Sequence, residues 1–391
     1  QVRAWAWPSR QIITFLLPDF YGNPTHHAYF DIWRRAWMPV TQNALGQPLN
    51  TINWGVKNYV EGTNYLGLPT LALAGLAIFG AARRWLRPRP GRNDDAAARS
   101  GMAREPSAHL ILGFTILAAL SLLFAFGTPL YALPFYLLPG YNQLHSAFRW
   151  VFPYTLSMAA LAGFGVSALL APATDGAAGP RARLDLSRAA TGLGLVSLAA
   201  GAASLAMVLF SMAFPAPFVA LGARILAASD LARANGFADG AMAWSYEAGV
   251  LAKFGLMAVL TGAALVWAAR SARPGRRSAR AESPSWPKGG RVGPATWAII
   301  VVLAADLWLF GHDFNPAVNR ELLTFTPPAI AWLQEQRDPT QPWRLTSFDG
   351  PDEKTLNANS AMIYGLEDVR GYDSIIPRQY VAYMKRIHPQ G

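Results

Sequence analysis

Six long apolar blocks, separated alternately by arginine-rich segments, constrain the fold of this chain more than any other feature. The blocks cover 65–82, 108–127, 150–171, 189–213, 249–269 and 295–311. At about 1.5 Å per helical residue, each block can cross a hydrocarbon layer of roughly 30 Å with help from its flanking residues. Hydrophobic residues make up 52% of the chain and charged residues only 15%. The sequence therefore predicts a mainly α polytopic membrane protein, a bundle of about six transmembrane helices over 65–311.

The basic residues are concentrated in three segments, 83–106, 172–188 and 270–292. Together these contain 17 of the 34 lysines and arginines and 6 of the 23 acidic residues, and so the whole formal net charge of +11. They follow the first, third and fifth blocks, which puts them on one side of a membrane, and the positive-inside rule assigns that side to the cytoplasm. Their Pro, Gly and Ala content predicts flexible linkers. We expect anionic membrane lipids beside them, and no nucleic-acid partner.

The other connecting segments are then exoplasmic, and function is expected there. They cover 1–64, 128–149, 214–248 and 312–391. In the first two, short aromatic runs broken by Pro and Gly predict interfacial or re-entrant helices, because they are too short to span. The tail from 312 reads as a small α+β soluble domain, with a helix in "TFTPPAIAWLQEQ" that has Thr326 as N-cap, a strand in "WRLTSF" and a helix in "RQYVAYMKRI".

The two ends of the sequence suggest a piece of a longer polypeptide. The chain opens on "QVRAWAWPSR" without an initiator Met or a signal peptide, and its last residues, "MKRIHPQG", stop just after a predicted helix has begun. It contains no cysteine, which excludes disulfides, thiolate metal sites and a cysteine nucleophile. It also lacks the P-loop, GxGxxG, GxSxG and HExxH motifs, so ATP-driven chemistry is not expected within it.

Arg149 departs from the rule that the other arginines obey, because it stands at the exoplasmic end of the third block. One interpretation is an anchor that reaches the outer headgroups or pairs with a nearby carboxylate. The other is a guanidinium directed at the phosphate of a lipid-linked substrate, for which its two-pronged geometry is suited. His145 would share a helix face with Arg149 if the helix begins early enough.

Asp306 lies inside the sixth block, where a carboxylate must face protein or water rather than lipid. It is either a substrate-binding residue or a structural hydrogen-bonding group, and Lys253 in the fifth block is one candidate ion-pair partner. The first exoplasmic segment supplies Asp19 and Glu61, which could act as a general base or as ligands of a divalent metal. His26 and His27 have no third ligand at regular spacing, so the sequence gives a metal site no support.

Several stretches resemble the YfhO-type bacterial membrane proteins, a family assigned to the GT-C superfamily of multi-pass glycosyltransferases. The resemblance runs in order along nearly the whole chain. Its elements are "LLPDFYG", "EGTNYLGLPTLALA", "LPGYNQLHSAFRWVFPYTLSMAALAGFG", "LAADLWLFGHDFNP" and "LNANSAMIYGLEDVRGYDSIIPRQY".

The resemblance implies an enzyme of the bacterial plasma membrane that transfers a sugar from a polyprenyl-phosphate carrier to an exoplasmic acceptor, either an envelope polymer or a glycolipid. In that family the catalytic acid follows the first span, so here it would lie upstream of Gln1. The family's tail signature falls on Asn359, Tyr364, Tyr372 and Asp373, which either bind substrate or only shape turns and satisfy backbone groups. A lipid or polymer transporter and a non-catalytic scaffold for envelope assembly are the alternative functions.

Overall fold

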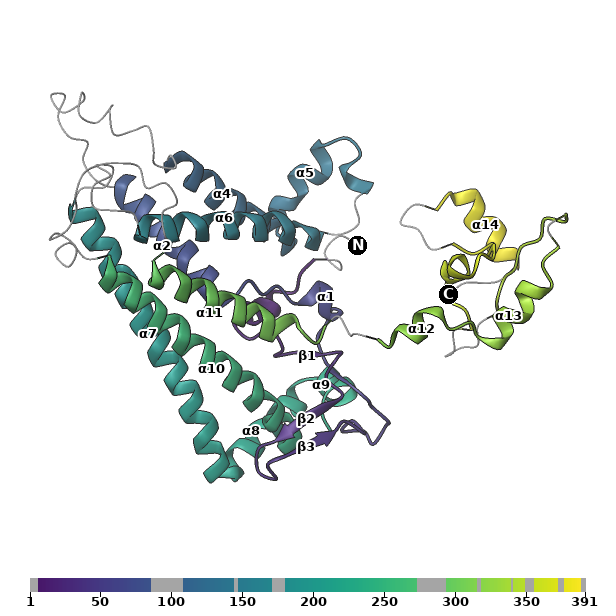
Figure 1. Ribbon diagram of the computed structural model, residues 1–391, viewed down its shortest axis with the longest axis horizontal. Helices are drawn as coiled ribbons and strands as arrows, with labels where there is room; N and C mark the ends of the chain where they lie inside the picture. Colours follow the sequence, from purple (N-terminus) through teal and green to yellow (C-terminus); the bar gives the residue numbers. More distant parts are fainter. Residues whose placement is uncertain are drawn as a thin grey trace. The chain divides into compact units, whose positions relative to one another are not determined.

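The computed structural model describes residues 6–85, 108–143, 147–170, 180–272, 293–314, 318–338, 340–348, 355–371 and 376–387. The chain divides into two compact units, Gln1–Asn315 and Pro316–Gly391. The first unit is a helical bundle with a largely irregular N-terminal segment, and the second is a small helical unit (Figure 1). Within the described ranges, five helices are long and apolar enough to cross a membrane.

The elements of the first unit begin with a 3₁₀ helix and four short strands. These are η2 (Ser9–Phe15), β1 (Gly22–Asn23), β2 (Ala28–Asp31), β3 (Ala36–Pro39) and β4 (Ile52–Asn53). The helices that follow are α1 (Tyr59–Gly62), α2 (Leu68–Trp85), α4 (Ala108–Ala125), η4 (Pro129–Tyr131), α5 (Ala132–Leu137), η5 (Tyr141–Gln143), η6 (Ala147–Trp150), α6 (Val151–Leu170), α7 (Pro180–Ala213), α8 (Pro215–Ala228), α9 (Asp230–Asn235), α10 (Gly240–Ser271) and α11 (Pro294–Gly311).

The five helices of spanning length are α4, α6, α7, α10 and α11, extended in the case of α6 by the preceding turn. Helix α2, the first predicted span, is apolar but shorter over Leu68–Arg83. Two of the predicted spans begin much earlier in the structure than in the prediction. Helix α7 already begins at Pro180, so the end of the predicted linker 172–188 is helical, and α10 begins at Gly240 instead of 249. The bulk of the three arginine-rich segments lies outside the described residues.

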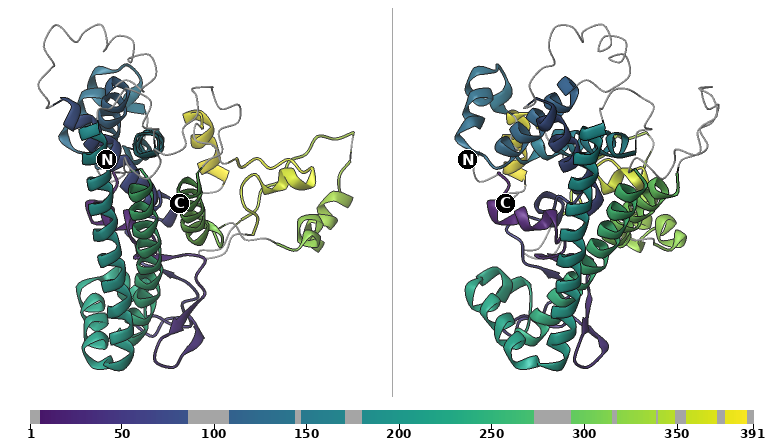
Figure 2. Two further views of the ribbon diagram at one scale, coloured as in Figure 1. Left: turned by 60° about the vertical axis from the view of Figure 1, so that its left-hand side comes forward. Right: turned by 90° about the vertical axis from the view of Figure 1, so that its left-hand side faces the viewer.

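Helices α7 and α10 pack closely side by side, because glycines face each other along their contact (Figures 1 and 2). A Cβ atom on Gly201 would lie 2.6 Å from the carbonyl oxygen of Gly255, and one on Gly262 would lie 2.5 Å from that of Gly194. Serine hydroxyls of α7 also donate to carbonyls of α10, namely Ser197 to Ala258 and Ser204 to Leu251, each at 2.8 Å. Small residues and hydroxyl groups of this kind hold helices together where lipid surrounds them.

The helix ends that adjoin the arginine-rich segments meet on one side of the bundle. Arg83 of α2 donates to Asp185 of α7 at 3.1 Å, and the Ser187 hydroxyl donates to the carbonyl of Ala269 in α10 at 2.9 Å. The N-terminal segment contacts the opposite ends. Its contacts there include the hydrogen bonds from the Trp7 amide to the Ala125 carbonyl and from the Trp33 indole to the Ser211 carbonyl. The two sets of helix ends therefore have different contacts within the described residues.

The N-terminal segment is held by two antiparallel strand pairs, β1 with β4 and β2 with β3. Gly22 has a φ of +85°, and a Cβ there would lie 2.3 Å from the Ile52 carbonyl oxygen, so only glycine fits. The strands lie with α8 and α9 at one end of the α7–α10 pair (Figures 1 and 2). A hydrophobic core that includes Trp54, Phe237 and Tyr246 joins them. This packing fixes the segment against the N-terminal half of α10.

The second unit contains α12 (Arg320–Thr324), α13 (Pro328–Glu335), η7 (Ser360–Tyr364) and α14 (Arg378–Ile387). The predicted strand in "WRLTSF" is wrong as a strand: there is only a single parallel bridge between Leu345 and Asp368. The predicted N-cap is also displaced by one residue, from Thr326 to Pro327, with Pro328 at the first helical position. Alternating polarity alone cannot produce a strand where no neighbouring strand supplies a hydrogen-bonded ladder.

Candidate functional site

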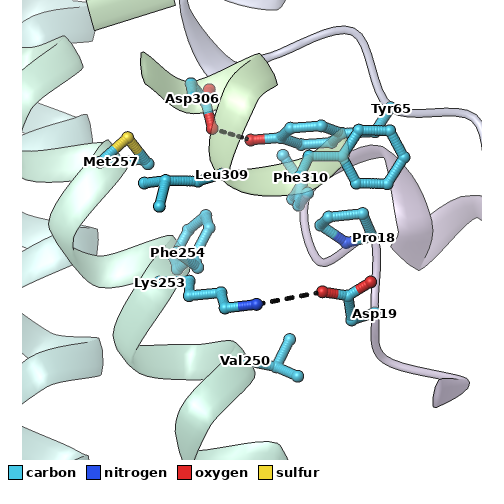
Figure 3. Close-up of a pocket in the computed structure, with 11 residues that line it drawn as sticks. Pro18, Asp19, Tyr65, Val250, Lys253, Phe254, Met257, Asp306, Leu309 and Phe310 are labelled. Carbon is cyan, nitrogen blue, oxygen red and sulfur yellow. Dashed lines mark hydrogen bonds and ion pairs between the residues drawn. The ribbon is translucent and has the colours of Figure 1, made fainter. Parts of the chain in front are cut away.

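A small pocket lies where the N-terminal segment meets α10 and α11 (Figure 3). Its walls are mostly apolar and include Phe254 of α10, Phe310 of α11 and Pro18. Its charged groups are Asp19, Lys253 and Asp306. The cavity volume of about 30 Å³ suits two or three water molecules or the end of a polar group rather than a whole sugar. Apolar walls around a few convergent polar groups are the usual composition of a ligand site.

Asp19 is held inside this pocket by the turn that follows η2. The amide of Gly22 donates to the Asp19 carbonyl at 2.8 Å, which closes the turn, and the side chain is only 3% exposed. Its Oδ1 accepts from the Tyr59 hydroxyl at 2.7 Å and from the Asn23 amide at 3.2 Å. Burial of a carboxylate without hydrogen-bond donors costs free energy. The hydrogen bonds from Tyr59 and Asn23 and the ion pair with Lys253 offset this cost.

Lys253 is the partner of Asp19. Its Nζ lies 3.4 Å from Asp19 Oδ2 (Figure 3), and its side chain is 48% exposed, so Lys253 is the more accessible partner of the pair. The predicted pairing of Lys253 with Asp306 is wrong, although both residues line the same pocket. The sequence separation of 234 residues between Asp19 and Lys253 concealed their contact.

Asp306 serves as a structural cap within the bundle. Its Oδ1 accepts from the Tyr65 hydroxyl at 2.7 Å, and its Oδ2 accepts from the backbone amide of Leu68 at 2.8 Å. Leu68 is the first residue of α2, so a carboxylate from α11 satisfies an amide at the positive end of that helix. Both oxygens of Asp306 accept hydrogen bonds, and the residue is only 3% exposed. These contacts favour a structural hydrogen-bonding role over substrate binding.

Further polar residues, from the N-terminal segment and the first turns of α10, lie close to Asp19 without lining the pocket. The His26 ring nitrogen Nδ1 lies 2.8 Å from the hydroxyl of Tyr246, a buried residue of α10. The next residue, Glu247, is 4% exposed, and its Oε1 has no hydrogen-bond partner among the described residues. Sequence reasoning missed Glu247, because "GAMAWSYEAG" appeared to belong to a connecting segment.

The electrostatics of the site keep several hydrogen-bond donors in place. Burial, followed by the charge of Asp19, raises the pKa of Tyr59 above its ordinary value, so the hydroxyl stays protonated and donates. Burial and the neighbouring Asp306 raise the pKa of Tyr65 in the same way. Burial lowers the pKa of His26 despite the opposing charge of Asp19, so the imidazole is neutral near pH 7.

Glu61 and Arg149, which the sequence also predicts as candidates, do not line this pocket. Glu61 is half-buried in α1, where its amide is capped by the Asn58 side chain at 2.9 Å. Arg149 is exposed in η6, and no hydrogen bond or ion pair links its guanidinium to another described residue. His145 lies outside the described residues. Lys253, and not Arg149, is therefore the cation of the pocket.

The candidates of the second unit have structural contacts. Asn359 has a φ of +70° and precedes η7, and the Tyr364 hydroxyl donates to the Phe325 carbonyl at 3.3 Å. A buried ion pair lies nearby, with Arg370 and Asp368 at 2.8 Å. Tyr372 and Asp373 lie outside the described residues.

Across the described ranges, no group of three His, Cys, Asp or Glu side chains is arranged to hold a metal ion. No protein family, curated protein or solved structure matches the chain. The chemistry of the pocket therefore has to be inferred from its own residues.

Proposed function

We propose that this chain belongs to a membrane glycosyltransferase of the GT-C type. It would transfer a sugar from a polyprenyl-phosphate carrier to an envelope polymer or glycolipid on the exoplasmic face of the bacterial plasma membrane. The observation that carries the proposal is the Asp19–Lys253 pair: a carboxylate and an ammonium share one small pocket at the junction of the exoplasmic segment and two candidate spans.

The reaction needs both of these charges. The acceptor hydroxyl oxygen attacks the anomeric carbon and gives its proton to Asp19 Oδ2, acting as general base. The bond from the anomeric carbon to the phosphate oxygen breaks, and the polyprenyl phosphate leaves with the bonding electrons. Lys253 stabilises the negative charge that develops on the departing phosphate. The product is a glycosylated acceptor with inverted configuration at the anomeric carbon.

The hydrogen bonds and the burial of Asp19 support its role as the base. Tyr59 and Asn23 fix one oxygen of Asp19 and leave the other directed at Lys253, so the base has a single defined orientation. The Asp19 side chain is only 3% exposed, and burial of the carboxylate strengthens its interaction with charge. The resemblance implies that the family's catalytic acid lies upstream of Gln1, so the assignment of the base to Asp19 rests on the contacts of its carboxylate and not on the resemblance.

A transfer assay tests the proposal on the purified full-length protein. Polyprenyl-phosphate sugar is supplied with a short envelope-polymer acceptor, and glycosylated acceptor is measured by mass spectrometry. We expect product with the wild type, a loss of about 10²-fold or more with Asp19→Asn, and little change with Glu61→Gln, which removes an acid outside the pocket. Equal rates for wild type and Asp19→Asn, at equal amounts of inserted protein, would rule out Asp19 as the base.

The transport alternative keeps one specific support. Because α10 begins at Gly240, the ionisable residues Glu247, Lys253 and Asp306 all lie within the candidate spans α10 and α11, and ionisable residues within spans are typical of transport pathways. Proteoliposomes that hold a fluorescent polyprenyl lipid separate the two functions. A transporter would expose the inner-leaflet lipid to an external quencher without any sugar transfer, whereas a transferase would leave the lipid distribution unchanged.

A further inference from the structure

The hydrogen-bonding capacity that is left over in the pocket indicates what can bind there. Both oxygens of Asp306 are already engaged, by the Tyr65 hydroxyl and the Leu68 amide. Oδ1 of Asp19 accepts from two donors, while Oδ2 contacts Lys253 Nζ and no other group of the described residues. An ammonium has three donors. Donors on the Lys253 ammonium and an acceptor site on Asp19 Oδ2 are therefore available to an incoming group.

The two partners are also unequally accessible. The Asp19 side chain is 3% exposed and that of Lys253 is 48% exposed, so an incoming group reaches the ammonium first. Lysine carries its charge on a flexible four-carbon stem, which lets Nζ change partner without movement of α10. At 3.4 Å the Nζ–Oδ2 contact is longer than a tight charge-assisted hydrogen bond.

We propose that Lys253 is the anion receptor of this pocket, and that it exchanges Asp19 for the phosphate head of an amphiphilic ligand. The phosphate binds Nζ, and Asp19 Oδ2 becomes free to accept from a hydroxyl group on the acceptor. The cavity of about 30 Å³ admits only the end of the head, while the side chains of Phe254 and Leu309 offer an apolar surface to the lipid stem. This exchange rests on the proposed function, because it describes how the pocket binds the polyprenyl-phosphate sugar that the transferase uses.

A binding experiment on the full chain in phosphatidylcholine nanodiscs tests the exchange without requiring any sugar transfer. The probes are a polyprenyl monophosphate, the uncharged polyprenol of equal length and inorganic phosphate as competitor. We expect the monophosphate to bind and the polyprenol not to bind. Lys253→Gln should weaken the monophosphate by about tenfold or more, whereas Arg224→Gln, a cation on α8 outside the pocket, should leave the affinity unchanged.

Asp19→Asn separates an anion receptor from a merely structural ion pair. It removes the competing carboxylate and leaves the ammonium, so we expect monophosphate affinity to be retained or increased. Full competition by inorganic phosphate would show that the head alone provides the affinity; no competition would show that the lipid stem is needed. Equal affinity in wild type and Lys253→Gln, equal binding of polyprenol and monophosphate, or an equal loss in Lys253→Gln and Asp19→Asn would each overturn the proposal.

Failure of the exchange and failure of the transferase remain distinguishable. If the monophosphate binds through Lys253 but no sugar is transferred, the anion receptor stands and the transferase proposal falls. If sugar is transferred while Lys253→Gln binds the monophosphate as the wild type does, the transferase proposal stands and the anion receptor falls.

Discussion

Asp19 Oδ2 and Lys253 Nζ lie 3.4 Å apart, although 234 residues separate them in the sequence. The contact joins the N-terminal segment to α10, and a half-exposed ammonium covers a buried carboxylate. The same pocket contains Asp306, whose oxygens are both used to hold α2 in place. One carboxylate of the site is therefore structural, and the other is available for chemistry.

Replacing Asp306 should lower the stability of the protein and leave the turnover of each folded molecule nearly unchanged. Asp306→Ala removes the cap of the Leu68 amide and leaves the buried Tyr65 hydroxyl without its acceptor, which we expect to cost about 1–3 kcal/mol. Asp306→Asn keeps one acceptor and should cost less. Thermal unfolding of the purified protein in detergent measures both. A larger effect on turnover per folded molecule than on unfolding temperature would contradict a purely structural role.

The α7–α10 contact should tolerate no added side chain at its glycines. Gly201→Ala places a Cβ 2.6 Å from the Gly255 carbonyl oxygen and should destabilise the protein by about 1–3 kcal/mol. Gly192→Ala in the same helix is the matched control, because a Cβ there meets nothing within 4 Å. Yield of folded protein and unfolding temperature provide the comparison, and equal behaviour of the two variants would refute the close packing.

Stability should fall as the solution becomes mildly acidic, partly through His26. Burial lowers its pKa below the ordinary value of 6.5, so the unfolded chain binds this proton more readily than the folded protein does. The contribution of His26 is therefore complete above pH 6.5 and is lost as the pH falls from there through the folded-state pKa. Unfolding temperatures between pH 7.5 and about 5 should show a weaker decline for His26→Gln than for wild type.

The side assignment can be tested directly, since the chain contains no cysteine. A single cysteine at Ala44, which is exposed in the N-terminal segment, should react with a membrane-impermeant maleimide on intact spheroplasts. One at Ser100, in the arginine-rich segment 83–106, should react only after lysis. Labelling of both positions, or of neither, before lysis would contradict the predicted topology.

The helical part of the fold could be predicted from the sequence because long apolar blocks leave little choice but spanning helices. The boundaries could not. Residues Gly240–Ala248 are buried against strands and short helices from elsewhere in the chain, so aromatic and acidic residues that look like a loop form the first turns of α10. Likewise, the alternation in "WRLTSF" predicts a strand, but a strand needs a partner that local sequence does not supply.

The pocket was only partly predictable for the same reason. Asp19, Lys253 and Asp306 each stood out, as charges in apolar or aromatic surroundings. Their pairing depends on how the N-terminal segment folds back onto α10, which is set by contacts across more than half of the chain. The alternation of charged segments yields a prediction of the sides of the bundle, which the labelling experiment can test, whereas the partners of individual charges required the structure.

The most direct test of the account compares envelope glycans by mass spectrometry in the native host, using the full-length gene. The strains are wild type, a deletion, and the deletion complemented with Asp19→Asn, Lys253→Gln or Glu61→Gln at equal levels of membrane-inserted protein. The account predicts that the deletion lacks one sugar modification, that Glu61→Gln restores it, and that neither pocket variant does. Restoration by Asp19→Asn, or a deletion with unchanged glycans, would contradict it.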